Sequence, residues 1–132
     1  MAVDTAVEAL IADAALSAHL ATSVDDRPHV APVWYVYEAG SLWVLTGGRK
    51  LANLRRNPRV AVSIERSDED GVDWGVQLQG TARAVSDEDR VEAVSERLDE
   101  IYSVPYGSDG GEDAEDWGLV ELFVGSATSQ RY

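Results

Sequence analysis

Residues 42–60, LWVLTGGRKLANLRRNPRV, are the stretch where a very acidic chain stops being acidic. No Asp or Glu lies between Glu38 and Glu65, although the whole chain carries 24 acidic residues against 11 Lys and Arg. The stretch opens with an apolar run at residues 42–46 that is typical of a β-strand, and two glycines then permit a tight turn. A short helix over residues 51–57 follows, and Pro58 prevents it from continuing. The stretch therefore predicts a strand, a turn and a helix in succession.

The same stretch gathers basic side chains. They are Arg49, Lys50, Arg55, Arg56 and Arg59, and Lys50 is the single lysine of the protein. A helix that begins near Lys50 presents unpaired backbone N–H groups and the positive end of its dipole beside an ammonium and a guanidinium. The sequence thus predicts an anion site with a phosphate as its natural ligand. The alternative is a solvated helix face whose arginines pair with acids elsewhere in the chain.

The composition limits what the rest of the chain can be. The 132 residues fit one domain, residues 1–132. The formal net charge of −13 argues against nucleic acid as a partner, because its phosphates would be repelled everywhere outside the basic stretch. Acids in such excess, with arginine nearly replacing lysine, suggest a halophilic protein adapted to high salt, where charge repulsion is screened. An acidic protein from an ordinary habitat is the alternative.

Other chemistries find no support in the sequence. The chain has no cysteine, which excludes disulfides, thiolate metal ligands and cysteine nucleophiles. No run approaches the roughly 18 apolar residues of a membrane span, and residues 1–10 do not resemble a secretory leader, so we expect a cytoplasmic protein with no membrane partner. The acidic segment 67–73 does not match a calcium loop, and no metal site is expected. The glycine-rich segment 103–116 is too acidic to cradle a phosphate.

On both sides of the basic stretch the pattern is mainly that of strands. Alternating or apolar runs predict strands at residues 18–24, 29–38, 60–65, 74–85 and 117–132, with Pro32 at an edge or bulge and Gly80 at a bend or a close backbone approach. Thr5 and Glu8 have the spacing of a capping box for an opening helix, and Ser86 is predicted to cap a second one. So many antiparallel strands would expose their edges unless the sheet closed on itself. The sequence therefore favours a mainly β fold with flanking helices, in the form of a small closed antiparallel barrel.

A family resemblance now becomes visible. Residues 20–65, LATSVDDRPHVAPVWYVYEAGSLWVLTGGRKLANLRRNPRVAVSIE, resemble the FMN-binding split-barrel family that includes pyridoxamine 5′-phosphate oxidase, and the likeness continues through VQLQGTARAVSDED. Its most specific parts are the PVW strand at residues 32–34, the strand that ends at Thr46 with Arg49 and Lys50 after it, the NLRRNPRV segment, and Gly80. The resemblance implies a closed split barrel that forms a homodimer with two cofactor sites at the subunit interface.

The resemblance also implies how FMN would be held. Thr46, Arg49 and Lys50 would bind its phosphate, in agreement with the anion site expected from the residues alone. The remaining contacts would surround the isoalloxazine ring. They are the backbone at Val33, Trp34 and Tyr35, the Gln77 side chain from the partner subunit, and Phe123 near the ring.

Two departures set this chain apart from the oxidase itself. The oxidase subgroup has a basic residue where this chain has Pro32, and its arginine- and histidine-rich C-terminal pattern is replaced here by SATSQRY. We therefore expect a small, general member of the family: an FMN-binding oxidoreductase of unknown substrate, in which no side chain needs to act as a catalytic acid or base. One alternative is a reductase that uses the deazaflavin coenzyme F-420. Another is a non-catalytic flavin-binding or sensing protein.

Overall fold

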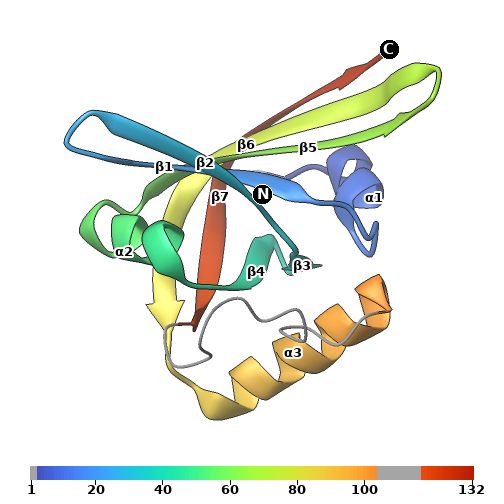
Figure 1. The fold of residues 1–132 in the computed structure, drawn as a ribbon. Helices are drawn as coiled ribbons and strands as arrows, with labels where there is room; N and C mark the ends of the chain where they lie inside the picture. The colour runs from blue at the N-terminus through green and yellow to red at the C-terminus, as the bar shows by residue number, and fades with distance from the viewer. Residues whose placement is uncertain (1–2, 104–116) are drawn as a thin grey trace.

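The structure is a computed structural model that describes residues 3–103 and 117–132. Three helices and seven strands make up this part of the chain (Figure 1). The helices are α1 (Thr5–Ile11), α2 (Gly48–Arg56) and α3 (Glu88–Tyr102). The strands are β1 (Ala18–Val24), β2 (Arg27–Val33), β3 (Val36–Glu38), β4 (Ser41–Thr46), β5 (Arg59–Asp68), β6 (Gly71–Val85) and β7 (Gly118–Arg131).

All seven strands join one antiparallel sheet in the order β2-β1-β5-β6-β7-β4-β3. The sheet does not close, so the prediction of a closed barrel is wrong. The two edge strands, β2 and β3, are consecutive in the chain and are joined only by Trp34 and Tyr35. The chain thus passes from one edge to the other by continuing β2 into β3, and two segments that meet end to end cannot form a ladder with each other. The predicted strand 29–38 is these two strands, broken at the connector Trp34–Tyr35.

Pro32 lies in the edge strand β2, as predicted, where its missing N–H costs no ladder hydrogen bond. Gly80 also confirms its prediction of a close backbone approach. The β6–β7 register shifts between Gln79 and Gly80, and Gly125 is the extra residue of the resulting bulge. A Cβ at Gly80 would lie 1.8 Å from the carbonyl oxygen of Phe123, so only glycine fits there.

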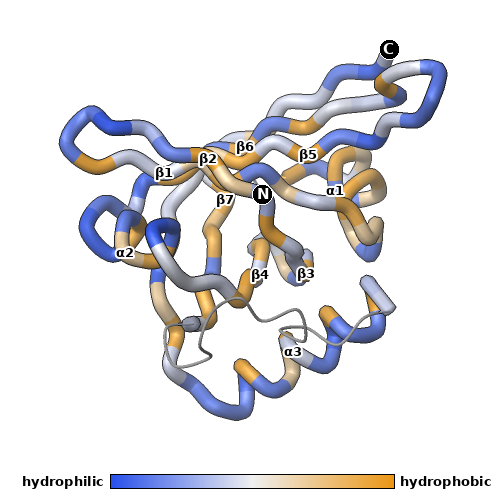
Figure 2. Tube along the Cα trace, in the orientation of Figure 1, coloured by the Kyte–Doolittle hydropathy of each residue, from blue (hydrophilic) through white to orange (hydrophobic). Residues whose placement is uncertain are grey.

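The core has two parts that meet across β4. Leu42 and Val44 face the concave side of the curved sheet, together with side chains from α1 and α2, while Trp43 and Leu45 face α3. This is why every residue of β4 is buried although the strand alternates sides. Figure 1 shows α1 and α2 on opposite flanks of the sheet and α3 below it. Hydrophobic and hydrophilic residues alternate along α3, and the tips of the long hairpins are hydrophilic (Figure 2).

Two helix caps differ from the prediction by one residue each. The Asp4 carboxylate accepts a hydrogen bond from the backbone N–H of Val7 at 2.9 Å and caps α1 in place of Thr5. Asp87 caps α3 in place of Ser86 and accepts from the N–H groups of Asp89 and Arg90. Both neighbours were plausible caps, but an aspartate also places a negative charge at the positive end of the helix dipole. No helix in the described residues is long and apolar enough to cross a membrane.

Candidate functional site

The first turn of α2 is the candidate anion site. β4 ends at Thr46, which is 2% exposed, and the chain turns through Gly47 into the helix, with Gly48 at a φ of 60°. Gly47 occupies the cap position without any side-chain hydrogen bond to the helix, and the first turn contains no acidic residue. Leu51 and Leu54 anchor the helix in the core. The N–H groups of this turn therefore lie next to the half-buried Lys50 and the exposed Arg49, and the cap residue offers them no side-chain acceptor.

The basic side chains of this region are mostly free of acidic partners. Arg56 forms an exposed ion pair with Asp25 at 3.4 Å. Within residues 3–103 and 117–132, Arg49, Lys50, Arg55 and Arg59 form no ion pair. The expectation of a solvated face paired with acids thus holds for Arg56 alone. An anion that approached α2 would meet positive charge that no carboxylate in the described part of the chain pairs with.

The connector Trp34–Tyr35 lies at the same end of the sheet as Thr46. The β3–β4 ladder pairs Val36 with Trp43 and is antiparallel, so the residue that precedes β3 and the residues that end β4 lie at one end of it. Val33 and Tyr35 are buried, and Trp34 is half-buried. The fold therefore gathers the predicted phosphate residues and the predicted ring-binding backbone at neighbouring positions.

Contacts from α3 and from the segment after α1 hold the connector in place. The backbone N–H of Tyr35 donates to the Tyr102 hydroxyl at 3.1 Å, and that hydroxyl donates to the carbonyl of Leu16 at 2.7 Å. The Trp34 ring stacks on the Tyr102 ring, with centroids 4.5 Å apart and planes 7° apart. The Tyr35 hydroxyl donates to the carbonyl of Ile11 at 2.7 Å. Burial raises the pKa of both Tyr35 and Tyr102, so both hydroxyls keep their protons for these bonds.

Tyr102 is the residue that sequence reasoning missed. Its partners lie 67 and 86 positions away in the chain, and no local pattern connects such residues. The only signal in the sequence was an aromatic residue directly after the apolar stripe of α3, which ends at Ile101.

Gln77 lies apart from the other predicted residues in a single subunit. It is exposed on β6 between the buried Val76 and Leu78, so its side chain points away from the core. Its amide oxygen accepts from the Thr128 hydroxyl at 3.4 Å. In the described part of the chain, no hydrogen bond or ring contact links Gln77 to the α2 turn or to the connector. A role for Gln77 at either place therefore requires a second subunit.

Gln77 belongs to a patch of the sheet that carries no charged residue, although Arg59 and Glu65 flank this patch on the same side of β5. Strand register aligns two rows across five strands on this side, which we call the acid-free face. One row is Pro32, His19, Ser63, Gln77 and Thr128, and the other is Val30, Ala21, Ala61, Gln79 and Ser126. Val30 is 64% exposed although it is aliphatic. Ten neighbouring positions without Asp or Glu are unusual in a chain with 24 of them.

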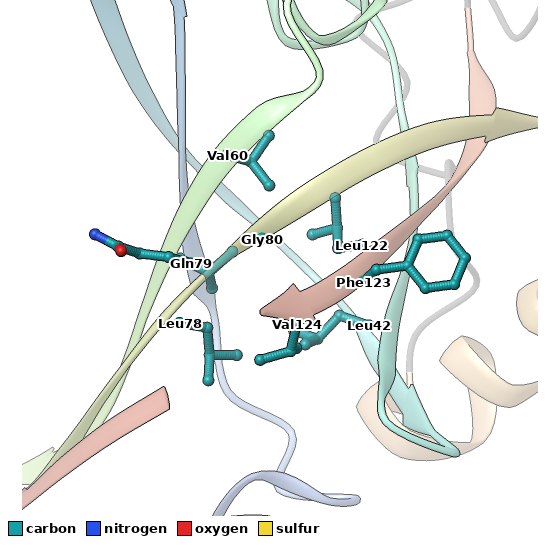
Figure 3. A pocket seen from close by; sticks show the side chains of 9 residues that line it. Leu42, Val60, Leu78, Gln79, Gly80, Leu122, Phe123 and Val124 are labelled. Atoms are coloured by element: carbon teal, nitrogen blue, oxygen red, sulfur yellow. The ribbon is translucent and has the colours of Figure 1, made fainter. Parts of the chain in front are cut away.

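Two hollows lie near the bulge in β7. An open groove of about 590 Å³ borders the acid-free face and is lined by Arg59, Thr81, Gly125 and neighbouring residues of β1, β2, β5 and β6. A second, apolar crevice of about 10 Å³ lies under the bulge (Figure 3). A space of that size holds about one water, so this crevice has no room for a cofactor. Phe123 points away from this crevice in Figure 3, and its ring lies 5.3 Å from the Arg83 guanidinium.

The comparison with protein families decides the identity of the fold. A family model described as pyridoxamine 5′-phosphate oxidase matches residues 4–123. The chain belongs to this family. No match was found among curated proteins. Membership confirms the family to which the PVW strand, the Arg49-Lys50 pair and the NLRRNPRV segment pointed.

Solved structures share this oxidase-like fold along nearly the whole chain. An FAD-binding protein from Mesorhizobium loti is similar with a TM-score of 0.77 at 18% identity, covering 96% of this chain and 94% of that one. The conserved hypothetical protein Rv2991 from Mycobacterium tuberculosis gives a TM-score of 0.77 at 26% identity, with 98% and 85% covered. An F-420 reductase gives 0.71 at 24% identity, with 96% and 98% covered. These likenesses show that the chain shares its fold with these proteins over nearly its whole length.

Proposed function

We propose that this protein is an FMN-binding oxidoreductase whose α2 turn holds the cofactor phosphate. The observation that carries the proposal is the uncapped first turn of α2, where Arg49 and Lys50 form no ion pair with any described residue, in a chain whose net charge is −13. A phosphate dianion fits this donor set, because backbone N–H groups, an ammonium and a guanidinium all converge on negative charge. Thr46 adds a hydroxyl from the end of β4.

The connector supports a place for the isoalloxazine ring. Val33, Trp34 and Tyr35 lie at the end of the sheet where α2 begins, so a cofactor with its phosphate at Lys50 would run its ring along this backbone. Bound FMN would supply the transfer of hydride or electrons. The protein would bind the phosphate, orient the ring and exclude water from one side of it. No side chain of the site needs to act as an acid or base.

We also propose that the protein is a homodimer, and the acid-free face supports this. Two chains that each carry −13 repel one another, and the repulsion is smallest where neither presents a carboxylate. The exposed Val30 and the exposed amide of Gln77 both lie on that face. A second copy docked there would bury apolar surface and could bring its Gln77 to the ring of the first. The groove of about 590 Å³ at the border of this face would then lie between subunits, where substrate could enter.

Titration of the protein with FMN tests the proposal. Purified protein should show the visible absorption of a flavin, or the apoprotein should bind FMN tightly. The Lys50→Ala variant should lose affinity by roughly 10- to 100-fold, the effect of one charge-assisted hydrogen bond. Arg56→Ala is the matched control, because Arg56 lies on the same helix but is already paired with Asp25. Equal affinity of the Lys50→Ala variant and the wild type would remove the phosphate assignment.

The same titration separates the alternatives. The likeness to the F-420 reductase, which shows a shared fold, makes the deazaflavin the second cofactor to try. Tight binding of coenzyme F-420 without binding of FMN would assign the protein to the deazaflavin reductases. Stoichiometric FMN with no turnover against nicotinamide donors and common acceptors would favour a non-catalytic flavin-binding or sensing protein.

A further inference from the structure

We propose that Tyr102 is a positioning residue for the flavin: from the last turn of α3 it fixes the connector Trp34–Tyr35 along which the ring is expected to lie. The inference rests on the proposed function, because it assigns a role toward the ring. It concerns a residue outside the predicted site, on a helix that carries none of the predicted site residues.

The connector needs an external support because it belongs to no strand. Residues 34 and 35 separate β2 from β3, and the two strands they join lie at opposite edges of the sheet. The N–H of Tyr35 is therefore paired with a side chain, the Tyr102 hydroxyl, and not with another strand. Buried backbone N–H groups must find such a partner, so this hydroxyl helps to fix where the peptide between Trp34 and Tyr35 sits.

The Tyr102 hydroxyl connects three separate segments. It accepts from the Tyr35 N–H at 3.1 Å, donates to the carbonyl of Leu16 at 2.7 Å, and also lies 3.4 Å from the carbonyl oxygen of Tyr35. The segment at Leu16 leads from α1 into β1, so the hydroxyl links the connector to this segment as well as to α3. The ring adds the parallel stack on Trp34.

Anchoring α3 would not by itself require this hydroxyl. Val94 and Leu98 are buried against β4 and β7 and hold the helix by apolar contact. Arg97 ties the same helix to Asp13, in the segment after α1, by an ion pair of 2.6 Å. What the hydroxyl adds is the hydrogen bond to the connector backbone. Its loss should therefore disturb the connector more than it disturbs the helix.

The test compares Tyr102→Phe with Arg97→Gln. The phenylalanine keeps the stacked ring and removes the hydroxyl, whereas Arg97→Gln breaks another tether between α3 and the segment after α1 without touching the connector. Two quantities are measured: amide hydrogen exchange at Tyr35 in the apoprotein by NMR, and the affinity and visible spectrum of bound FMN. Tyr102→Phe should speed exchange at Tyr35, weaken FMN binding roughly tenfold and shift the flavin absorption band. Arg97→Gln should change none of them.

The outcomes separate this inference from the proposed function. Wild-type protein that binds no flavin overturns the proposed function, and the inference with it, before any variant is compared. Wild-type protein that binds FMN, together with Tyr102→Phe that matches it in affinity and spectrum, overturns the positioning role alone. If Tyr102→Phe fails to fold, Trp34→Phe loosens the same connector through the stack and should shift the spectrum and affinity in the same direction. An unchanged flavin in that variant overturns the positioning role as well.

Discussion

Gly80 is the residue that allows the two longest strands to approach each other closely. β6 and β7 approach so closely there that an added Cβ would lie 1.8 Å from the Phe123 carbonyl oxygen, and that obstacle is backbone, which cannot swing aside. We expect Gly80→Ala to destabilise the fold by about 3 kcal/mol or more, at the upper end of overpacking. Gly118→Ala is the control, because its Cβ would meet the flexible ends of two side chains, Leu51 at 3.4 Å and Arg55 at 3.9 Å. Urea unfolding measures both, and equal midpoints would contradict the close approach.

A buried tyrosine gives the stability a pH dependence at the alkaline end. Burial raises the pKa of Tyr37 to about 12. In the unfolded chain a tyrosine loses its proton near pH 10, so between about pH 10 and 12 the unfolded state binds fewer protons than the folded state. Tyr37 thus lowers the free energy of unfolding by up to about 1.4 kcal/mol per pH unit in that window and contributes no slope below it. The Tyr37→Phe variant should lose this share of the slope in urea unfolding between pH 9 and 11.5, and an unchanged slope would rule the contribution out.

At the scale of elements, β4 and α2 were predictable because their signals are local. An apolar run, the pair Gly47-Gly48 and Pro58 determine a strand, a turn and a short helix without help from the rest of the chain. The path of the connector was not predictable in the same way. Trp34 and Tyr35 continue the strand pattern of their neighbours, and only the position of both sheet edges shows that the chain crosses between them. The failure of the sheet to close and the contact with Tyr102 both depend on that crossing.

The same distinction between local and long-range signals explains which parts of the candidate site could be predicted. Arg49 and Lys50 were found because a gap in acidic residues is visible in the sequence, and the structure adds that the α2 turn has no side-chain cap. Gln77 could be named only through the family likeness, since within one subunit it faces away from the other predicted residues. The acid-free face was invisible in the sequence, because its ten members come from five strands and only the register brings them together.

The phosphate site proposed at α2 leads to a prediction that requires a second ligand, riboflavin, beside FMN. If its first turn holds the phosphate, wild-type protein should bind FMN at least roughly tenfold more tightly than riboflavin, which has the same ring and no phosphate. Lys50→Ala should reduce that preference while it leaves riboflavin affinity unchanged. The two titrations, followed by quenching of flavin fluorescence, separate loss of the phosphate contact from damage to the ring site. A variant that weakens both ligands equally would show that Lys50 acts on the fold and not on the phosphate.

At the scale of the whole molecule, the proposed homodimer and the excess of acids make one joint prediction. A new carboxylate at the centre of the acid-free face should oppose association, because both copies would bring it to the same contact. We expect wild-type protein to run as a dimer in light scattering coupled to size exclusion, and Ala61→Glu to shift it toward monomer at low salt. Ala93→Glu makes the same substitution on the exposed side of α3 and should leave the dimer intact.

Measurements at different salt concentrations show whether Ala61→Glu acts by charge repulsion between subunits or by damage to the fold. At about 1 M salt the Debye length falls to about 3 Å, so repulsion between exposed carboxylates and the self-repulsion of a chain at −13 are both screened. Wild-type protein should therefore unfold at a higher temperature in molar salt than at 50 mM, and Ala61→Glu should recover part of its dimer there. A variant that stays monomeric at every salt concentration while it melts like the wild type would point to a steric block. A wild-type protein that is monomeric throughout would refute the dimer, and with it the route by which Gln77 could reach the ring.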